Sequence, residues 1–96
     1  MPQFVFTYRA PNGYAGSPDE VAKWRSWFEG LGGAVDVVGE PVFTRADVGE
    51  CGPTTNLGGY SVISADSLAD AVGLVEGCPI IDVGGGVVVG ELTPTT

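Results

Sequence analysis

One carboxylate lies inside an otherwise apolar segment of this sequence. Asp36 stands between Ala34-Val35 and Val37-Val38, and the run of β-branched residues predicts a strand. A carboxylate on a buried strand face has a raised pKa and can serve as a general acid or base. In the competing interpretation Asp36 lies near a strand end or the mouth of a cleft, where water solvates it. We take Asp36 as the candidate catalytic residue.

Two arginines are candidate binding groups for a small anionic ligand. Arg9 and Arg45 are half of the four basic residues, in a chain that has twelve acidic ones. A guanidinium can hold a carboxylate through two parallel hydrogen bonds. Each arginine can equally form an ion pair with an acidic residue of this chain, and we favour that interpretation.

Three further residues complete the predicted ligand-binding set. Tyr8 and Tyr60 each combine an apolar ring with a polar tip, so they suit a cleft wall as well as a core or an interface. Glu40 can face Asp36 across a cleft, although a turn residue before Pro41 is the interpretation we favour. The ligand-binding candidates are therefore Tyr8, Arg9, Glu40, Arg45 and Tyr60.

Composition excludes several other classes of site. The chain has no histidine, so it holds no Ser-His-Asp triad, no Cys-His pair and no imidazole metal ligand. Two cysteines are too few for a disulfide scaffold or a thiolate zinc site, and we expect neither a metal nor a cofactor. The net charge of −8 disfavours nucleic acid and anionic membrane surfaces. No apolar run approaches the ~20 residues of a membrane span, and no signal peptide is visible, so we expect a cytoplasmic protein.

The first helix is marked at both ends. Ser17 fits the N-cap of a helix over residues 18–31, with Glu20 completing a capping box and Gly32 following the last turn. Its predicted buried stripe is Val21, Trp24, Phe28 and Leu31. Trp27 lies off the centre of that stripe, at a helix edge or against a partner.

A second helix follows Ser67, again with an acidic residue, Asp70, three positions later. Gly77 and Pro79 end it, residues 80–83 form a connector, and the glycines at 84–86 permit a bend. Its predicted buried stripe is Leu68, Ala71, Val72 and Val75.

Strands are predicted at residues 3–9, 34–39, 58–64 and 87–92, with an irregular loop over 42–56. The order β-α-β-β-α-β in one domain, residues 1–96, indicates an α+β ferredoxin-like fold, a four-stranded antiparallel sheet with two helices on one face. Several strands have apolar residues on both faces of the sheet. The face without helices would therefore expose an apolar surface unless another molecule covers it. We expect a homodimer formed through this open sheet face.

Three segments carry most of a family resemblance: Leu57-Gly58-Gly59-Tyr60, Ala65-Asp66-Ser67-Leu68 and Gly77-Cys78-Pro79-Ile80. On these motifs the chain resembles the YCII-related, or DGPF, family, and the resemblance extends over nearly its whole length. It implies a dimeric α/β barrel whose cleft serves small-molecule enzymes and uncharacterised binding proteins. Cys51-Gly52-Pro53-Thr54 replaces the family's Asp-Gly-Pro-Phe motif, and the histidine of its His-Asp dyad is missing.

Two functions from different classes follow. In the first, the chain is a homodimeric domain that binds a small molecule or acts as an accessory or regulatory module. In the second, it is a small-molecule isomerase or lyase that uses Asp36 for proton transfer in the barrel cleft. The missing histidine favours the first.

Overall fold

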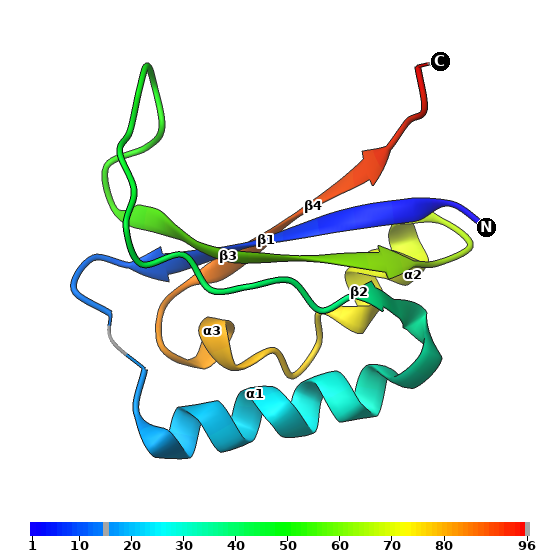
Figure 1. The fold of residues 1–96 in the computed structure, drawn as a ribbon, viewed down its shortest axis with the longest axis horizontal. Helices are drawn as coiled ribbons and strands as arrows, with labels where there is room; N and C mark the ends of the chain where they lie inside the picture. The colour runs from blue at the N-terminus through cyan, green and yellow to red at the C-terminus, as the bar shows by residue number, and fades with distance from the viewer. Residues whose placement is uncertain (15, 96) are drawn as a thin grey trace.

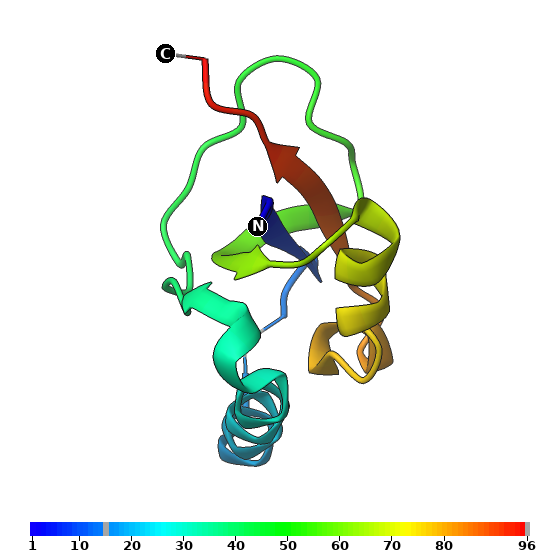
Figure 2. The same cartoon turned by 90° about the vertical axis from the view of Figure 1, so that its right-hand side faces the viewer.

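The computed structural model describes residues 1–14 and 16–95. It is an α+β structure in two layers, with a four-stranded sheet on one side and the helices on the other (Figures 1 and 2). The strands are β1 (Gln3–Pro11), β2 (Val35–Val37), β3 (Thr55–Ser64) and β4 (Gly86–Leu92). The helices are α1 (Pro18–Leu31), the 3₁₀ helix η1 (Gly32–Ala34), α2 (Leu68–Leu74) and α3 (Pro79–Asp82).

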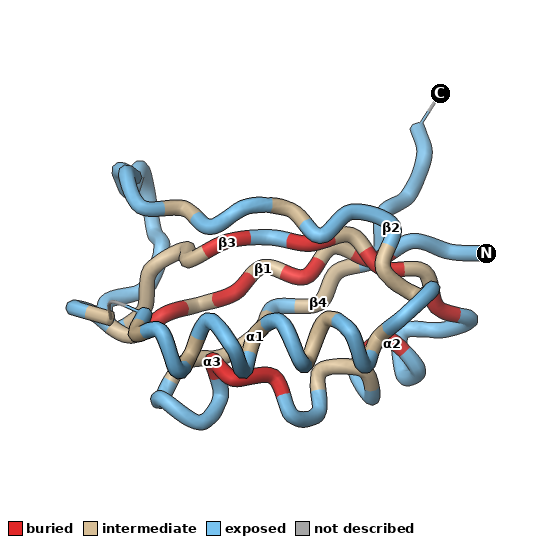
Figure 3. The backbone as a smooth tube through the Cα atoms, turned by 60° about the horizontal axis from the view of Figure 1, so that its bottom comes forward, coloured by how far each residue is buried: buried red, intermediate tan, exposed pale blue. Residues whose placement is uncertain are grey.

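The sheet has the order β2-β3-β1-β4, and each neighbouring pair is antiparallel. Phe4, Phe6 and Tyr8 of the central strand β1 are buried against the helices, as the period of two predicts. The buried positions in Figure 3 lie mainly on β1, β3 and the segment around α3, and α2 adds Ala71. The core therefore lies between one sheet face and the helical layer.

Helix α1 begins where its capping box predicts, since the Ser17 hydroxyl accepts a hydrogen bond from the Glu20 amide at 3.3 Å. The predicted stripe is wrong at two positions. Trp27 packs on the core, stacked on Phe6 with ring centroids 6.4 Å apart, while Val21 is 55% exposed. At about 100° per residue, Val21 lies farther from the centre of the packed face than Trp27 does.

Helix α2 begins at the predicted cap, where the Ser67 hydroxyl accepts from the Asp70 amide at 3.1 Å. Ala71 is buried and Val75 packs on the core, as predicted, but Leu68 and Val72 are half-exposed. The helix ends at Leu74, and its packed face is centred on Ala71. The two exposed residues lie to one side of that face.

The predicted connector is in part a short helix. Pro79 and Ile80, in α3, are buried, and proline at the first helical position favours the start of this short helix. The predicted glycine bend follows directly: Gly84 has a φ of +90° and the Gly85 amide donates to the Ile80 carbonyl at 2.8 Å. This bend returns the chain into β4.

Two strands differ in length from their predictions. β2 covers only Val35–Val37, since Ala34 belongs to η1 and Gly39 turns with a φ of +78°. β3 begins earlier than predicted, at Thr55. The segment 42–54 between them has no regular helix or strand, as predicted.

Candidate functional site

The sheet face turned away from the helices is the candidate site, and we call it the open face. Because Phe4, Phe6 and Tyr8 point to the helices, the alternate residues of β1 point away from them. Cross-strand pairing adds Val62 and Tyr60 of β3 and Val88 and Leu92 of β4. The members used below are Gln3, Val5, Thr7, Arg9, Asp36, Val37, Tyr60, Val62, Ser64, Val88 and Leu92.

The middle of the open face is apolar. Val5 pairs with Val62, which also pairs with Val37, so three valines lie side by side across the sheet. Val37 is 46% exposed and Val88, on the other edge, is 57% exposed. The open face therefore presents apolar side chains to water, as the two-sided pattern of the strands predicts.

Asp36 lies at one end of the open face in a small polar cluster. One of its carboxylate oxygens accepts from the Gln3 side-chain amide at 3.0 Å and from the Ser64 hydroxyl. These hydrogen bonds, that of Gln3 first, lower the pKa of Asp36 below its ordinary value. The expectation of a buried carboxyl with a raised pKa is therefore wrong. Asp36 is a solvent-exposed carboxylate that accepts hydrogen bonds from two donors.

The pairing of β2 explains why Asp36 reaches water. Val35 pairs with Ile63 and Val37 with the next residue, Val62, so Asp36 is an extra residue in an irregular step. This step places Asp36 beside Ser64 on the open face.

Glu40 does not approach Asp36 along the sheet. Pro41, which follows Glu40, forms a bridge with Gly59, whereas Asp36 contacts Ser64. Gly59 and Ser64 are about 16 Å apart along an extended strand. Glu40 is exposed and does not face Asp36 across a cleft, which agrees with its interpretation as a turn residue before Pro41.

The two arginines are far from equivalent. The Arg9 guanidinium donates to the carbonyls of Thr55 at 2.9 Å and Cys51 at 3.2 Å, and to the Thr55 hydroxyl at 3.3 Å. All three acceptors are neutral, and through these hydrogen bonds Arg9 holds the loop before β3. Arg45 is exposed on that loop and lines a shallow hollow of about 450 Å³ with Phe43 and Asp47.

The two tyrosines lie on opposite faces of the sheet. Tyr8 is buried under the helices, where its hydroxyl donates to Ser61 at 2.7 Å, and burial raises its pKa. Tyr60 is exposed on the open face, paired with Thr7. Of the two, Tyr60 alone can meet a ligand at the open face.

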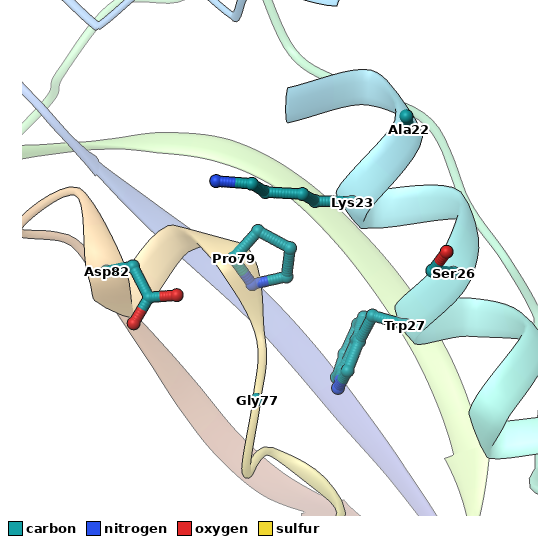
Figure 4. Close-up of a pocket in the computed structure, with 7 residues that line it drawn as sticks. All are labelled: Ala22, Lys23, Ser26, Trp27, Gly77, Pro79 and Asp82. Atoms are coloured by element: carbon teal, nitrogen blue, oxygen red, sulfur yellow. The ribbon is translucent and has the colours of Figure 1, made fainter. Parts of the chain in front are cut away.

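A groove between α1 and α3 was missed by sequence reasoning. It measures about 480 Å³, and Figure 4 shows Trp27 and Lys23 of α1 facing Pro79 and Asp82 across it. The Trp27 indole nitrogen donates to the Glu76 carbonyl at 3.3 Å. The one available signal was Trp27 itself, an aromatic residue off the predicted stripe.

Among the described residues, no cluster of three or more cysteine, aspartate or glutamate side chains is placed to hold a metal ion. In the same part of the chain, every buried side-chain nitrogen or oxygen has a hydrogen-bond partner. No helix there has both the length and the apolar character needed to cross a membrane.

Comparison with protein-family models, with curated proteins and with solved structures finds no match to this chain.

Proposed function

We propose that this chain is a ferredoxin-like domain of the YCII-related type that forms a homodimer through its open face and binds a small molecule between the two sheets. The observation that carries the proposal is the open face itself. It exposes Val37, Tyr60, Val88 and Leu92 on one side of the sheet. Soluble proteins rarely leave such a surface in water, and a second copy is a self-complementary cover.

The sheet topology supports the ferredoxin-like part of this proposal, and the resemblance supports the dimer. A sheet of order β2-β3-β1-β4, antiparallel throughout and with helices on one face, is the arrangement that a ferredoxin-like unit has. The YCII-related resemblance of the sequence implies face-to-face sheets. In such a dimer the valines of the open face become a second core.

The polar groups of the open face indicate the class of ligand. Asp36 has a second carboxylate oxygen besides the one that accepts from Gln3 and Ser64, whereas the Arg9 guanidinium already donates to the loop before β3. The fitting ligand is therefore a small molecule with an apolar body and a hydrogen-bond donor or cationic group. Tyr60 adds an aromatic wall and a hydroxyl.

Light scattering at micromolar concentration tests the dimer. We expect twice the 9.8 kDa chain mass for the wild type and a single chain mass for Val88→Asp. Val21→Asp is the matched control, because Val21 is similarly exposed but lies on α1. A wild-type monomer would overturn the proposal. Native mass spectrometry of the purified dimer then tests for a bound small molecule, which Asp36→Asn should release.

The second candidate is an isomerase or lyase that uses Asp36 as a base. The oriented, ionised carboxylate favours it, because a covering sheet would remove water from Asp36 and make it more basic. Turnover of a bound metabolite that disappears in Asp36→Asn would favour this candidate. Turnover that survives the substitution would exclude Asp36 as the base.

A further inference from the structure

The loop that connects β2 to β3 carries two nearly uncovered apolar side chains. We call residues 42–54 the β2–β3 arm. Phe43 is 84% exposed and Val48 is 89% exposed, which makes them the most exposed of the large apolar side chains in the described chain. Burying a phenylalanine or valine side chain is favourable, so two of them uncovered on one short loop are candidates for a contact with a second molecule.

The arm is held at its base. Arg9 donates to the Cys51 carbonyl at its C-terminal side, and the Val42 amide donates to the Gly58 carbonyl at its start, at 3.1 Å. The Asn12 side chain also donates to the Pro53 carbonyl at 3.2 Å. A segment tied at both ends loses less conformational entropy on binding than a free loop does.

The arm projects on the open-face side of the sheet. Figure 1 shows it rising from the sheet on the side away from α1 and α3, and Figure 2 shows the same from a perpendicular direction. A partner seated on the open face would therefore lie beside the arm, which makes the arm continuous with the proposed dimer interface.

The area of the open face also calls for an additional contact. Four strands spaced by about 4.8 Å, with about seven residues of 3.3 Å each, give a flat area on the order of 450 Å². Stable interfaces bury roughly 800 Å² on each partner. The accessible area of the side chains exceeds this flat area, but the edge strand β2 contributes only three residues, and the net charge of −8 makes two copies repel each other. Apolar contacts outside the sheet would enlarge the interface and offset this repulsion.

We propose that the β2–β3 arm of each chain packs on the second copy and buries Phe43 and Val48 there. The inference rests on the proposed homodimer and adds a segment of each chain that contacts the other copy. The crosslinking experiment below would detect a different protein bound to the arm.

Substitution of the two apolar residues tests the proposal. In Phe43→Ser/Val48→Ser we expect the dimer dissociation constant, measured by sedimentation equilibrium, to rise by about 100-fold or more, since each dimer loses four buried apolar side chains. Both residues are exposed in the single chain, so the fold should persist, with an unchanged circular dichroism spectrum. Val21→Ser is the matched control and should leave the dissociation constant unchanged.

Photo-crosslinking identifies the occupant. A photoreactive phenylalanine analogue at position 43, in a mixture of isotopically light and heavy chains, should give crosslinked peptides that join light to heavy copies. Crosslinks only within one chain, or an unchanged dissociation constant in the double variant, would overturn the arm contact while the homodimer stands. A wild-type monomer would overturn both proposals. Crosslinks in a cell extract to an unrelated protein in place of a second copy would overturn the arm contact alone.

Discussion

The Tyr8 hydroxyl donates a 2.7 Å hydrogen bond to the Ser61 hydroxyl, and both side chains are buried. Ser61 in turn donates to the Val38 carbonyl at 2.5 Å. The two bonds link the central strand β1, its neighbour β3 and the backbone that leaves β2. One buried chain of hydroxyls therefore joins three segments of the sheet.

Removing the Tyr8 hydroxyl and removing the Ser61 hydroxyl should lower the free energy of unfolding by different amounts. Tyr8→Phe removes one donor and leaves Ser61 bonded to Val38, so we expect a loss of about 1 kcal/mol in the free energy of unfolding. Ser61→Ala leaves both the Tyr8 hydroxyl and the Val38 carbonyl without a partner, and we expect about 2–3 kcal/mol. Urea unfolding followed by circular dichroism measures both values.

The double variant is the control for this pair. Because the two residues share a hydrogen bond, Tyr8→Phe/Ser61→Ala should lose less than the sum of the single variants. Losses that simply add would contradict the linkage.

Gly39 is a position where a side chain has no space. It has a φ of +78°, and an added Cβ would lie 1.8 Å from the Tyr60 carbonyl oxygen. Gly49 has nearly the same φ, +79°, and open space around it. We expect Gly49→Ala to cost about 1 kcal/mol through backbone strain alone, and Gly39→Ala at least about 3 kcal/mol, because the edge of the sheet must open. Thermal unfolding measures both; equal losses would contradict the steric argument.

Features with a local cause could be predicted from the sequence. The caps at Ser17 and Ser67 follow from a hydroxyl and the amide three residues later, and both are confirmed. The alternation of Phe4, Phe6 and Tyr8 likewise needs only the pleat of a strand, and these residues are buried as predicted.

Features that depend on how elements meet could not be predicted. Trp27 of α1 is packed on the core and Leu68 of α2 is half-exposed, each against its prediction, because the rotation of a helix about its axis is set by tertiary packing. The position of Asp36 depends on the irregular step between Val35 and Val37, which the apolar pattern does not encode. The role of Arg9 depends on a loop more than forty residues away.

The hydrogen bonds to Asp36 predict that its pKa is lower than that of a free carboxyl group. Gln3 and Ser64 donate to the ionised form, so the pKa lies below the ordinary value of 3.8. Any stability that comes from these bonds is present above that ordinary value and is lost as the pH falls through the lowered pKa. We expect Gln3→Ala, and to a smaller extent Ser64→Ala, to raise the pKa of Asp36. Carbon-detected NMR of the carboxyl group during an acid titration measures it.

Thr7→Ala is the matched control for that titration. Thr7 lies on the same face of β1 but its hydroxyl donates to the Val88 carbonyl, not to Asp36. The pKa of Asp36 should be unchanged in this variant. A wild-type pKa above the ordinary value would mean that the partner sheet, and not the two donors, controls this carboxyl group.

The two cysteines should differ sharply in reactivity. Cys51 is exposed on the β2–β3 arm, whereas Cys78 is buried before α3, and burial raises the pKa of its thiol to about 11. Because the thiolate is the reactive form, native protein at pH 8 should react with a disulfide reagent at one thiol per chain, and denatured protein at two. Cys51→Ser should abolish the native reaction and Cys78→Ala should leave it intact.

The raised pKa of Cys78 should make the folded chain less stable at alkaline pH. The folded chain holds the Cys78 thiol neutral, so its contribution to stability is complete below the ordinary pKa of 9.0 and is lost as the pH rises toward about 11. Cys78→Ala should flatten this part of the pH–stability curve, measured by thermal unfolding from neutral to alkaline pH. Rapid labelling of Cys78 in the native chain at pH 8 would show instead that the segment between α2 and α3 opens readily to solvent.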